Sequence, residues 1–387
     1  RLKKSQNFKG MAENYLGWDN VQYLYLRSFF PQNHLLKKIE EAYNFYMTQA
    51  EKYWLSQARY GQGMIALTMF RCGKKDITDK IIASIREHAL RNEEMGMYWK
   101  VNAGGWYWYQ APIETQSLMI ELFADATKDT VAVNEMKLWL LKQKQTQDWK
   151  TTKATTEAVY ALLLQGNNWL DNTKMAEIKV GNQTIDPTKL EGTSVEAGTG
   201  YFRTSWTGGD VKPEMATITV TNPNQSPAWG AVYWQYFENL DKITTAETPL
   251  MLSRKYFIEQ QTDAGAVIKP LLDTASLKVG DKVIVRIELR CDRAMEFVHM
   301  KDMRASGLEP INVISSYKWQ DGLGYYESTK DASTNFFMDR VQPGTYVFEY
   351  PLRVVQRGAF SCGITSIQCM YAPEFSSHSE GKRINVK

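Results

Sequence analysis

The spacing of the hydrophobic residues changes near residue 172, and this change constrains the fold more than any other feature of the chain. Before it, apolar residues recur at intervals of three and four, which is the spacing of an amphipathic helix. After it, apolar and polar residues alternate, as in a half-buried strand. The sequence therefore predicts a multidomain α and β protein, with helices first and antiparallel sheets second.

Two kinds of helix are predicted in the first part. Residues 39–46, 81–89 and 136–140 each have one apolar and one polar face, so they are expected on the outside. The segments GMIALTMF, SLMIELFA and AVYALLLQ are apolar nearly all round, which indicates burial on every side. Outer and inner helices thus alternate along the chain.

A tryptophan precedes each inner helix by a constant distance. Three tryptophans lie eight residues before a glutamine or glutamate that opens such a helix: Trp54 before Gln62, Trp108 before Gln116, and Trp149 before Glu157. This repeat predicts helical hairpins arranged as a partial α/α toroid, with Trp108 as a packing residue. Trp106 and Tyr107 lie outside the repeat, and they are the candidate ligand-facing residues of the chain.

Alternation predicts several strands after residue 172. In VGDKVIVRIELRC and GTYVFEYPLRVV, one face is apolar: Val279, Val283, Val285, Ile287, Leu289 and Cys291 in the first, and Tyr346, Phe348, Tyr350, Leu352 and Val354 in the second. Further strands are expected at YFRTSW, ATITVTN and WGAVYWQYF. Antiparallel β-sandwich domains are the expected architecture. With a break between two β units at 246–255, the predicted domains are 1–172, 173–248 and 249–387.

Charge, hydropathy and cysteine content exclude several classes of protein. The net charge of +3, from 46 basic and 43 acidic residues, does not favour binding to nucleic acid. No segment approaches the ~18 consecutive apolar residues of a membrane span. The four cysteines are too few for a disulfide framework, so buried free thiols are expected. The first residue is Arg1, which suggests a piece of a longer polypeptide.

No catalytic, cofactor-binding or metal-binding residue is predicted. The four histidines lack metal-ligand spacing. Glu114 and Glu121 could form the acid–base pair of a sugar-cleaving toroid, but Glu114 also fits the start of an inner helix, where a carboxylate is stabilising. Three acidic residues could hold calcium, although a solvated loop fits them better: Asp321, Glu327 and Asp331.

The C-terminal stretches resemble the closing domain of bacterial α2-macroglobulin-like proteins. The resemblance is carried by Gly280-Asp281, Asp302, Gly307-Leu308-Glu309-Pro310, Gly344-Thr345-Tyr346 and Met370-Tyr371-Ala372-Pro373-Glu374. The helical part resembles the thioester domain of the same family in IETQSLMIELFAD and WLLKQKQTQDWKTTKATTEAVYALLLQ. The intervening residues, 173–248, fall where the family has a small CUB-like β domain.

This resemblance implies a non-enzymatic function. It implies a C-terminal portion of a peptidase inhibitor that traps attacking peptidases by a change of shape. Its partners would be the upstream domains of the parent polypeptide and the peptidases. The location implied is extracytoplasmic, either periplasmic or at the cell surface, with a lipid anchor conceivable upstream.

The covalent chemistry of many family members has no counterpart in this chain. Their thioester motif is Cys-x-Glu-Gln, and the nearest string here, YFIEQQ, has Phe257 in place of the cysteine. No thioester residue is therefore transferred to this sequence. The alternative hypothesis is a carbohydrate-active or glycan-binding protein, in which Trp106, Tyr107 and Trp108 line an open cleft with two facing carboxylates.

Overall fold

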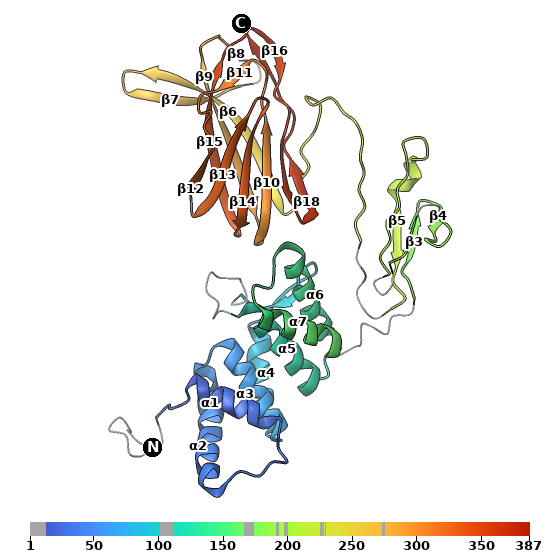
Figure 1. Ribbon diagram of the computed structural model, residues 1–387, viewed down its shortest axis with the longest axis vertical. Coiled ribbons are helices and arrows are strands. Elements are labelled where there is room, and N and C mark those ends of the chain that lie inside the picture. The colour runs from blue at the N-terminus through green and yellow to red at the C-terminus, as the bar shows by residue number, and fades with distance from the viewer. Residues whose placement is uncertain are drawn as a thin grey trace. The chain divides into compact units, whose positions relative to one another are not determined.

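The computed structural model describes residues 13–100, 111–165, 174–190, 193–196, 200–224, 228, 230–272 and 275–387. Helices come first and predominantly antiparallel sheets follow, which confirms the predicted fold class (Figure 1). The chain divides into two compact units: Arg1–Lys142 with Trp149–Gly230, and Gln143–Asp148 with Ala231–Lys387. The predicted domain boundaries at 172 and 248 remain a prediction.

Helices of two kinds alternate in the first part, as predicted. The described α-helices are α1 (Trp18–Ser28), α2 (Lys37–Tyr53), α3 (Arg59–Arg71), α4 (Lys75–Glu87), α5 (Pro112–Ala126), α6 (Thr130–Thr146) and α7 (Thr152–Leu164), with the short 3-10 helix η2 (Trp54–Ser56). An inner row forms because α1 contacts α3, α3 contacts α5, and α5 contacts α7. Their apolar residues share one core with α4 and α6.

Local sequence sets the ends of the inner helices. The Thr151 side chain caps α7 by accepting a hydrogen bond from the amide of Ala154 at 3.0 Å. Pro112 occupies the first turn of α5, where its missing N–H is not needed. Gly73, with φ of 73°, ends α3, and the next amide, that of Lys74, bonds back to Met69 O.

Burial on every side is confirmed for two of the three predicted inner helices. Gly61–Met69 of α3 and Ile113–Ile120 of α5 are unbroken runs of buried residues. For α7 the prediction is wrong, since Val159, Tyr160 and Leu164 are exposed. The reason is that α7 has an inner-row neighbour, α5, on one side and none among the described helices on the other.

The tryptophan repeat is a packing feature where the structure describes it. Trp149 is 8% exposed and belongs to the helical core, and Trp54 packs against that core while half-buried. Trp106, Tyr107 and Trp108 lie outside the described residues. The roles predicted for those three side chains therefore remain predictions.

A short hairpin follows α4, and its glycine is placed tightly. Strands β1 (Leu90–Asn92) and β2 (Gly96–Tyr98) are antiparallel. Gly96 has φ of 73°, and a Cβ there would lie 2.1 Å from the carbonyl oxygen of Glu135 in α6. Gly73 has the same φ with nothing within 4 Å of the equivalent position.

We expect Gly96→Ala to destabilise the helical part more than Gly73→Ala. Both changes force an L-residue into the left-handed region, at about 1–2 kcal/mol. Only Gly96→Ala adds an overlap with backbone, which costs about 1–3 kcal/mol more. Urea unfolding followed by circular dichroism at 222 nm measures the difference, and equal losses in the two variants would show that this hairpin is not tightly packed on α6.

The middle of the chain contains a small sheet. Strands β3 (Glu177–Val180), β4 (Gln183–Ile185) and β5 (Ile218–Thr221) pair in the order β4-β3-β5, and the 3-10 helix η6 (Pro213–Ala216) precedes β5. The predicted strand in ATITVTN is confirmed as β5. The strand predicted at 201–206 is wrong, and so is the strand predicted at WGAVYWQYF, in its described residues 230–237. A strand forms only where a neighbouring strand takes its backbone hydrogen bonds. The CUB-like assignment remains a prediction.

Two larger sheets and a small one build the C-terminal part. The six-stranded sheet has the order β12 (Ser316–Gln320), β13 (Leu323–Lys330), β14 (Ser333–Val341), β10 (Met295–Met303), β17 (Thr365–Cys369), β18 (Ala372–His378). The five-stranded sheet has the order β11 (Leu308–Pro310), β15 (Gly344–Val354), β9 (Lys282–Cys291), β6 (Leu250–Thr262), β7 (Gly265–Pro270). The third comprises β16 (Gly358–Ser361), β19 (Arg383–Val386) and β8 (Ser276–Leu277), in that order.

Alternating burial is confirmed in the two long predicted strands. In β9 and β15 the predicted apolar face is buried, and both sheets contribute to a single core. Val279 is the exception, being 49% exposed, because β9 begins only at Lys282. Asp321 and Gly322 both have positive φ and form the turn between β12 and β13.

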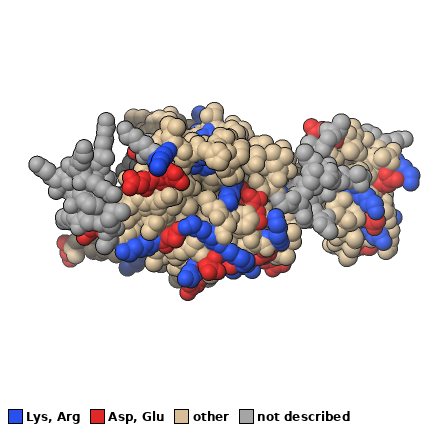
Figure 2. Space-filling view, turned by 90° about the horizontal axis from the view of Figure 1, so that it is seen from below, with Lys and Arg blue, Asp and Glu red and all other residues tan. Residues whose placement is uncertain are grey.

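The structure also bears on the predictions made from cysteine content, charge and hydropathy. Cys291, Cys362 and Cys369 are buried free thiols as predicted, whereas Cys72 is exposed, because it follows the last turn of α3. Figure 2 shows basic and acidic side chains interspersed over the face that it draws. In the part of the chain that the structure describes, no helix is long and apolar enough to span a membrane.

Candidate functional site

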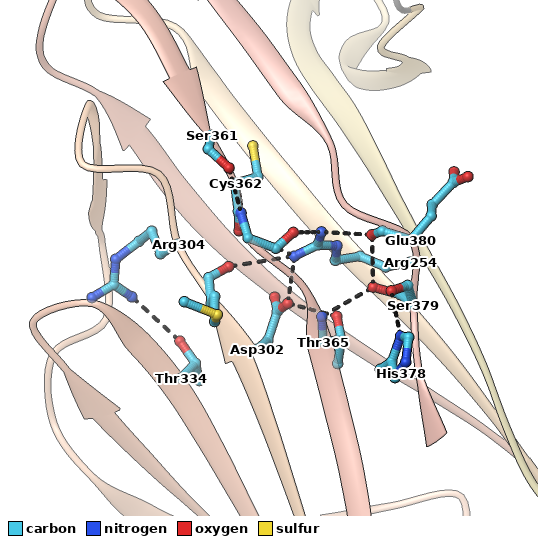
Figure 3. A network of polar contacts seen from close by, with 12 residues as sticks. Arg254, Asp302, Arg304, Thr334, Ser361, Cys362, Thr365, His378, Ser379 and Glu380 are labelled. Carbon is cyan, nitrogen blue, oxygen red and sulfur yellow. Dashed lines mark hydrogen bonds and ion pairs between the residues drawn. The ribbon is translucent and has the colours of Figure 1, made fainter. Parts of the chain in front are cut away.

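The strongest polar constellation lies in the core between the two larger sheets. In β6, inward positions alternate along Leu250, Leu252 and Arg254, so an arginine enters the core. In β10, the same alternation carries Met300 and Asp302 inward. The Arg254 and Asp302 side chains are 2% and 0% exposed, and Arg254 Nη1 lies 2.9 Å from Asp302 Oδ1 (Figure 3).

Asp302 accepts hydrogen bonds from both sheets. Thr365 Oγ1 of β17 donates to Oδ1 at 2.6 Å, and the Tyr350 hydroxyl of β15 donates to Oδ2. Burial first, and then the Asp302 charge, raise the pKa of Tyr350 far above its ordinary value, which keeps the phenol protonated as a donor. The carboxylate is therefore stabilised by three donors from three different strands.

Arg254 binds backbone carbonyls of two loops and of the last residue of β10 with its other contacts. Nη2 donates to Gly363 O at 2.6 Å and to Glu380 O at 3.3 Å, and Nη1 reaches Met303 O and Cys362 O at 3.4 Å (Figure 3). Burial lowers the pKa of Arg254, but Tyr256 and Asp302 more than offset this and hold it above its ordinary value. The guanidinium stays charged, and it connects β6 to the β16–β17 and β18–β19 loops.

This network can fix the sandwich but is not arranged for catalysis. Its cysteine, Cys362, is 0% exposed, and burial raises the pKa of its thiol, so the unreactive protonated form prevails at neutral pH. The donors and acceptors around Asp302 are used within the protein. Sequence reasoning noted Asp302 through the family resemblance and missed Arg254. The signal in the sequence was a charged residue at a position of each strand that faces the core, one basic and one acidic.

A second polar cluster lies where the inner helices begin. Thr151 Oγ1 is 3.5 Å from Glu114 Oε1, and the Tyr60 hydroxyl is 3.5 Å from Glu157 Oε1. Lys153 Nζ lies 3.5 Å from Glu157 Oε1 and 3.3 Å from the Tyr60 hydroxyl. Burial first raises the pKa of Glu157, which Lys153 lowers and Glu114 raises further.

This cluster replaces the carboxylate pair considered from the sequence. Glu114 and Glu121 are seven residues apart on α5, which separates them by about 10 Å along the helix axis. Glu121 instead pairs with Arg71 of α3 and accepts a hydrogen bond from Tyr25 at 3.1 Å. Glu114 instead interacts electrostatically with Glu157, whose charge Lys153 offsets. The cluster therefore fits the packing of helix ends better than acid–base chemistry.

The calcium candidate is not assembled either. Asp321 and Asp331 lie in the turns at opposite ends of β13, so about 10 residues of extended chain, or roughly 30 Å, separate them. Glu327 is 3% exposed and bonded to Lys318 Nζ at 2.8 Å. Among the described residues, no group of three acidic, histidine or cysteine side chains is placed to hold a metal ion.

Aromatic side chains, two exposed and two half-buried, form a row across the six-stranded sheet. Strand register places Tyr317, Tyr326, Phe337 and His299 side by side on β12, β13, β14 and β10. The rings of His299 and Phe337 are stacked, with centroids 4.6 Å apart and 13° between their planes. Each of these two rings therefore covers one face of the other.

One family model matches the chain. Residues 250–374 match "Bacterial Alpha-2-macroglobulin MG10 domain". The match covers β6 to β17 and the start of β18, and thus contains Arg254, Asp302, Tyr350 and Thr365. The predicted resemblance to this family is confirmed over these residues. No curated protein matches the chain.

Solved structures of bacterial α2-macroglobulins are similar to the chain at low identity. They include the trypsin-activated protein of Escherichia coli (13% identity, TM-score 0.41, 98% of this chain and 25% of that one). Another is the Salmonella protein reacted with methylamine (14%, TM-score 0.30, 95% and 24%). A third is the Escherichia coli protein activated by porcine elastase (12%, TM-score 0.35, 95% and 33%). The chain thus spans a quarter to a third of their length.

Proposed function

Because residues 250–374 are similar to an MG10 domain of bacterial α2-macroglobulin, we propose that this chain is the C-terminal portion of a peptidase inhibitor of that kind. The inhibitor traps attacking peptidases by a change of shape, and this portion performs no catalytic step. Its partners are the upstream domains of the parent polypeptide and the trapped peptidases. It acts outside the cytoplasm, in the periplasm or at the cell surface.

The match to the MG10 domain carries this proposal, and the buried network supports it. A trap that rearranges after a distant cut needs modules that move as rigid bodies. Arg254 and Asp302 join both large sheets and two loops of the C-terminal module through hydrogen bonds. The chain contains no Cys-x-Glu-Gln motif, so the proposal assigns it no thioester residue.

The proposal predicts a size-dependent protection of substrates. The parent polypeptide is incubated with a broad-specificity peptidase, and cleavage of a large protein is compared with cleavage of a small peptide. We expect loss of the first and retention of the second, because a cage excludes only substrates too large to enter. The control is the peptidase without the parent polypeptide, which should cleave both substrates.

Equal retention of both activities, for several peptidases, would contradict the proposal. The glycan-binding alternative would then be tested with Trp106→Ala and Trp108→Ala. Those residues lie outside the described part of the chain, so the alternative rests on the sequence alone.

A further inference from the structure

Residues 239–248 lie beside the connection between β18 and β19, and we call them the strap. The strap belongs to the same compact unit as the C-terminal sheets. It forms an isolated bridge with β18, in which Ala246 and His378 exchange backbone hydrogen bonds of 3.1 and 3.0 Å. Its further contacts are Gly381 N to Ile243 O at 2.9 Å, Thr248 N to Ser377 Oγ at 2.8 Å, and Arg383 Nη1 to Asp241 Oδ2 at 3.2 Å. The strap is thus held by separate polar contacts and not by a ladder.

The strap itself buries little surface. Every one of its residues is described, and each is exposed or half-buried. The Arg383 and Asp241 side chains are 54% and 30% exposed, so their ion pair contributes little. A segment with few buried apolar contacts opens locally at a lower free energy than the core strands beside it.

The loop under the strap, residues 379–382, is bound firmly to the sheets. Ser379 N donates to Thr365 O at 2.9 Å, and Ser379 Oγ accepts from Thr365 N at 3.0 Å. Arg254 Nη2 donates to Glu380 O at 3.3 Å, which ties the same loop to the buried network (Figure 3). Of the two segments in contact, the loop therefore stays with the sheets when the strap opens.

Gly381 is the point of closest approach between the strap and this loop. A Cβ at residue 381 would lie 1.7 Å from Leu240 O and 2.9 Å from Asp241 Cα. Gly381 does not have a positive φ, so lack of space, and not backbone conformation, requires a glycine here. A side chain at this position displaces the strap without straining the loop.

We propose that the strap is a releasable latch, which leaves the β18–β19 connection while the sheets stay folded. Release adds its residues to the chain that connects the two compact units, up to roughly 33 Å when extended. It also uncovers β18, an end strand of its sheet. The inference deepens the proposed function and rests on it in one respect, since it names the segment that frees the C-terminal module during the change of shape.

Hydrogen exchange in the 387-residue chain tests whether the strap opens by itself. The amides of Ala246 and Thr248 should exchange at least about 100-fold faster than the central β9 amides, because release does not require the sheet to open. Gly381→Ala should accelerate the strap amides by a further factor on the order of 10 and change β9 by less than about 2-fold. Ala246→Pro, which removes a donor at an exposed position, should accelerate Thr248 in the same way.

Gly344→Ala is the matched control in the same module. Gly344 also lacks a positive φ, and a Cβ there would lie 3.6 Å from its nearest neighbour, so strap exchange should not change. Equal exchange of strap and β9 amides in the unsubstituted chain would overturn the proposal, because the strap would then open only with the sheet. Strap exchange that neither Gly381→Ala nor Ala246→Pro accelerates would do the same.

A distance measurement tests whether release frees the module. Spin labels are placed on Cys72, which is exposed, and on Lys301→Cys at an exposed position of β10, whereas the other three cysteines are buried. The distribution of distances between the labels should broaden with Gly381→Ala and not with Gly344→Ala. An unchanged distribution, despite faster strap exchange, would contradict the role in movement. Neither measurement uses a peptidase, so a failed trap assay would refute the proposed function and leave the latch standing.

Discussion

Asp302→Ala is expected to destabilise the C-terminal sheets by about 3–5 kcal/mol, since it leaves the Arg254 charge buried without its partner. It also leaves the Tyr350 and Thr365 hydroxyls without their acceptor. The loss should appear as faster exchange of the central β9 and β15 amides, which exchange only when the sheet opens. Exchange in α3 and α5 should not change.

Glu349→Ala provides the matched comparison. Glu349 forms an ion pair with Arg286 between β15 and β9, but both side chains are more than a third exposed, so its loss should cost less than about 1 kcal/mol. Replacement of both buried partners, as Arg254→Met with Asp302→Leu, should restore much of the stability, because no unpaired charge then remains. If Asp302→Ala and Glu349→Ala have equal effects, the network does not hold the two sheets together.

The stability of the helical part should rise between pH 8 and 10.5, and Lys137→Met should abolish that rise. Lys137 in α6 is 0% exposed, and its Nζ donates to Leu162 O at 2.9 Å near the end of α7. Burial lowers its pKa from 10.5 to about 8. Between these values the unfolded chain binds more protons than the folded chain, so raising the pH favours folding, by up to about 3 kcal/mol.

At pH 7 Lys137 is protonated in both states, so its burial is then fully destabilising. Lys137→Met should therefore be more stable than the unsubstituted chain at pH 7. The gain in stability is reduced by about 1 kcal/mol, because the hydrogen bond of Lys137 is lost. Urea unfolding followed by circular dichroism at 222 nm, between pH 7 and 9.5, measures both effects. Above this range, tyrosines with a raised pKa, such as about 12 for Tyr43, lower the stability as the pH rises. Lys144→Met, at an exposed position of α6, is the control. If the stability of the unsubstituted chain and that of Lys137→Met change equally with pH, the lowered pKa of Lys137 does not cause the rise.

The spacing of apolar residues was enough to predict those helices and strands in which the apolar positions are the buried ones. The spacing in α3 and α5 and the alternation in β9 and β15 predicted both the type of element and its buried face. The same kind of pattern predicted strands at 201–206 and 230–237 wrongly. Alternation describes how a side chain could face a core, but a strand forms only where another strand accepts its backbone hydrogen bonds.

The buried network could not be predicted from periodicity, because its members are far apart in the sequence. Arg254 lies 48 residues from Asp302 and 126 from Glu380, and Asp302 lies 63 from Thr365. Likewise, the sequence alone placed Glu114 with Glu121, whereas the packing of α5 beside α7 brings it to Glu157. The sequence by itself determined the helix and strand pattern and the family resemblance of residues 250–374. The tertiary structure alone decided which charges meet, because such pairs depend on which elements pack together and not on spacing along the chain.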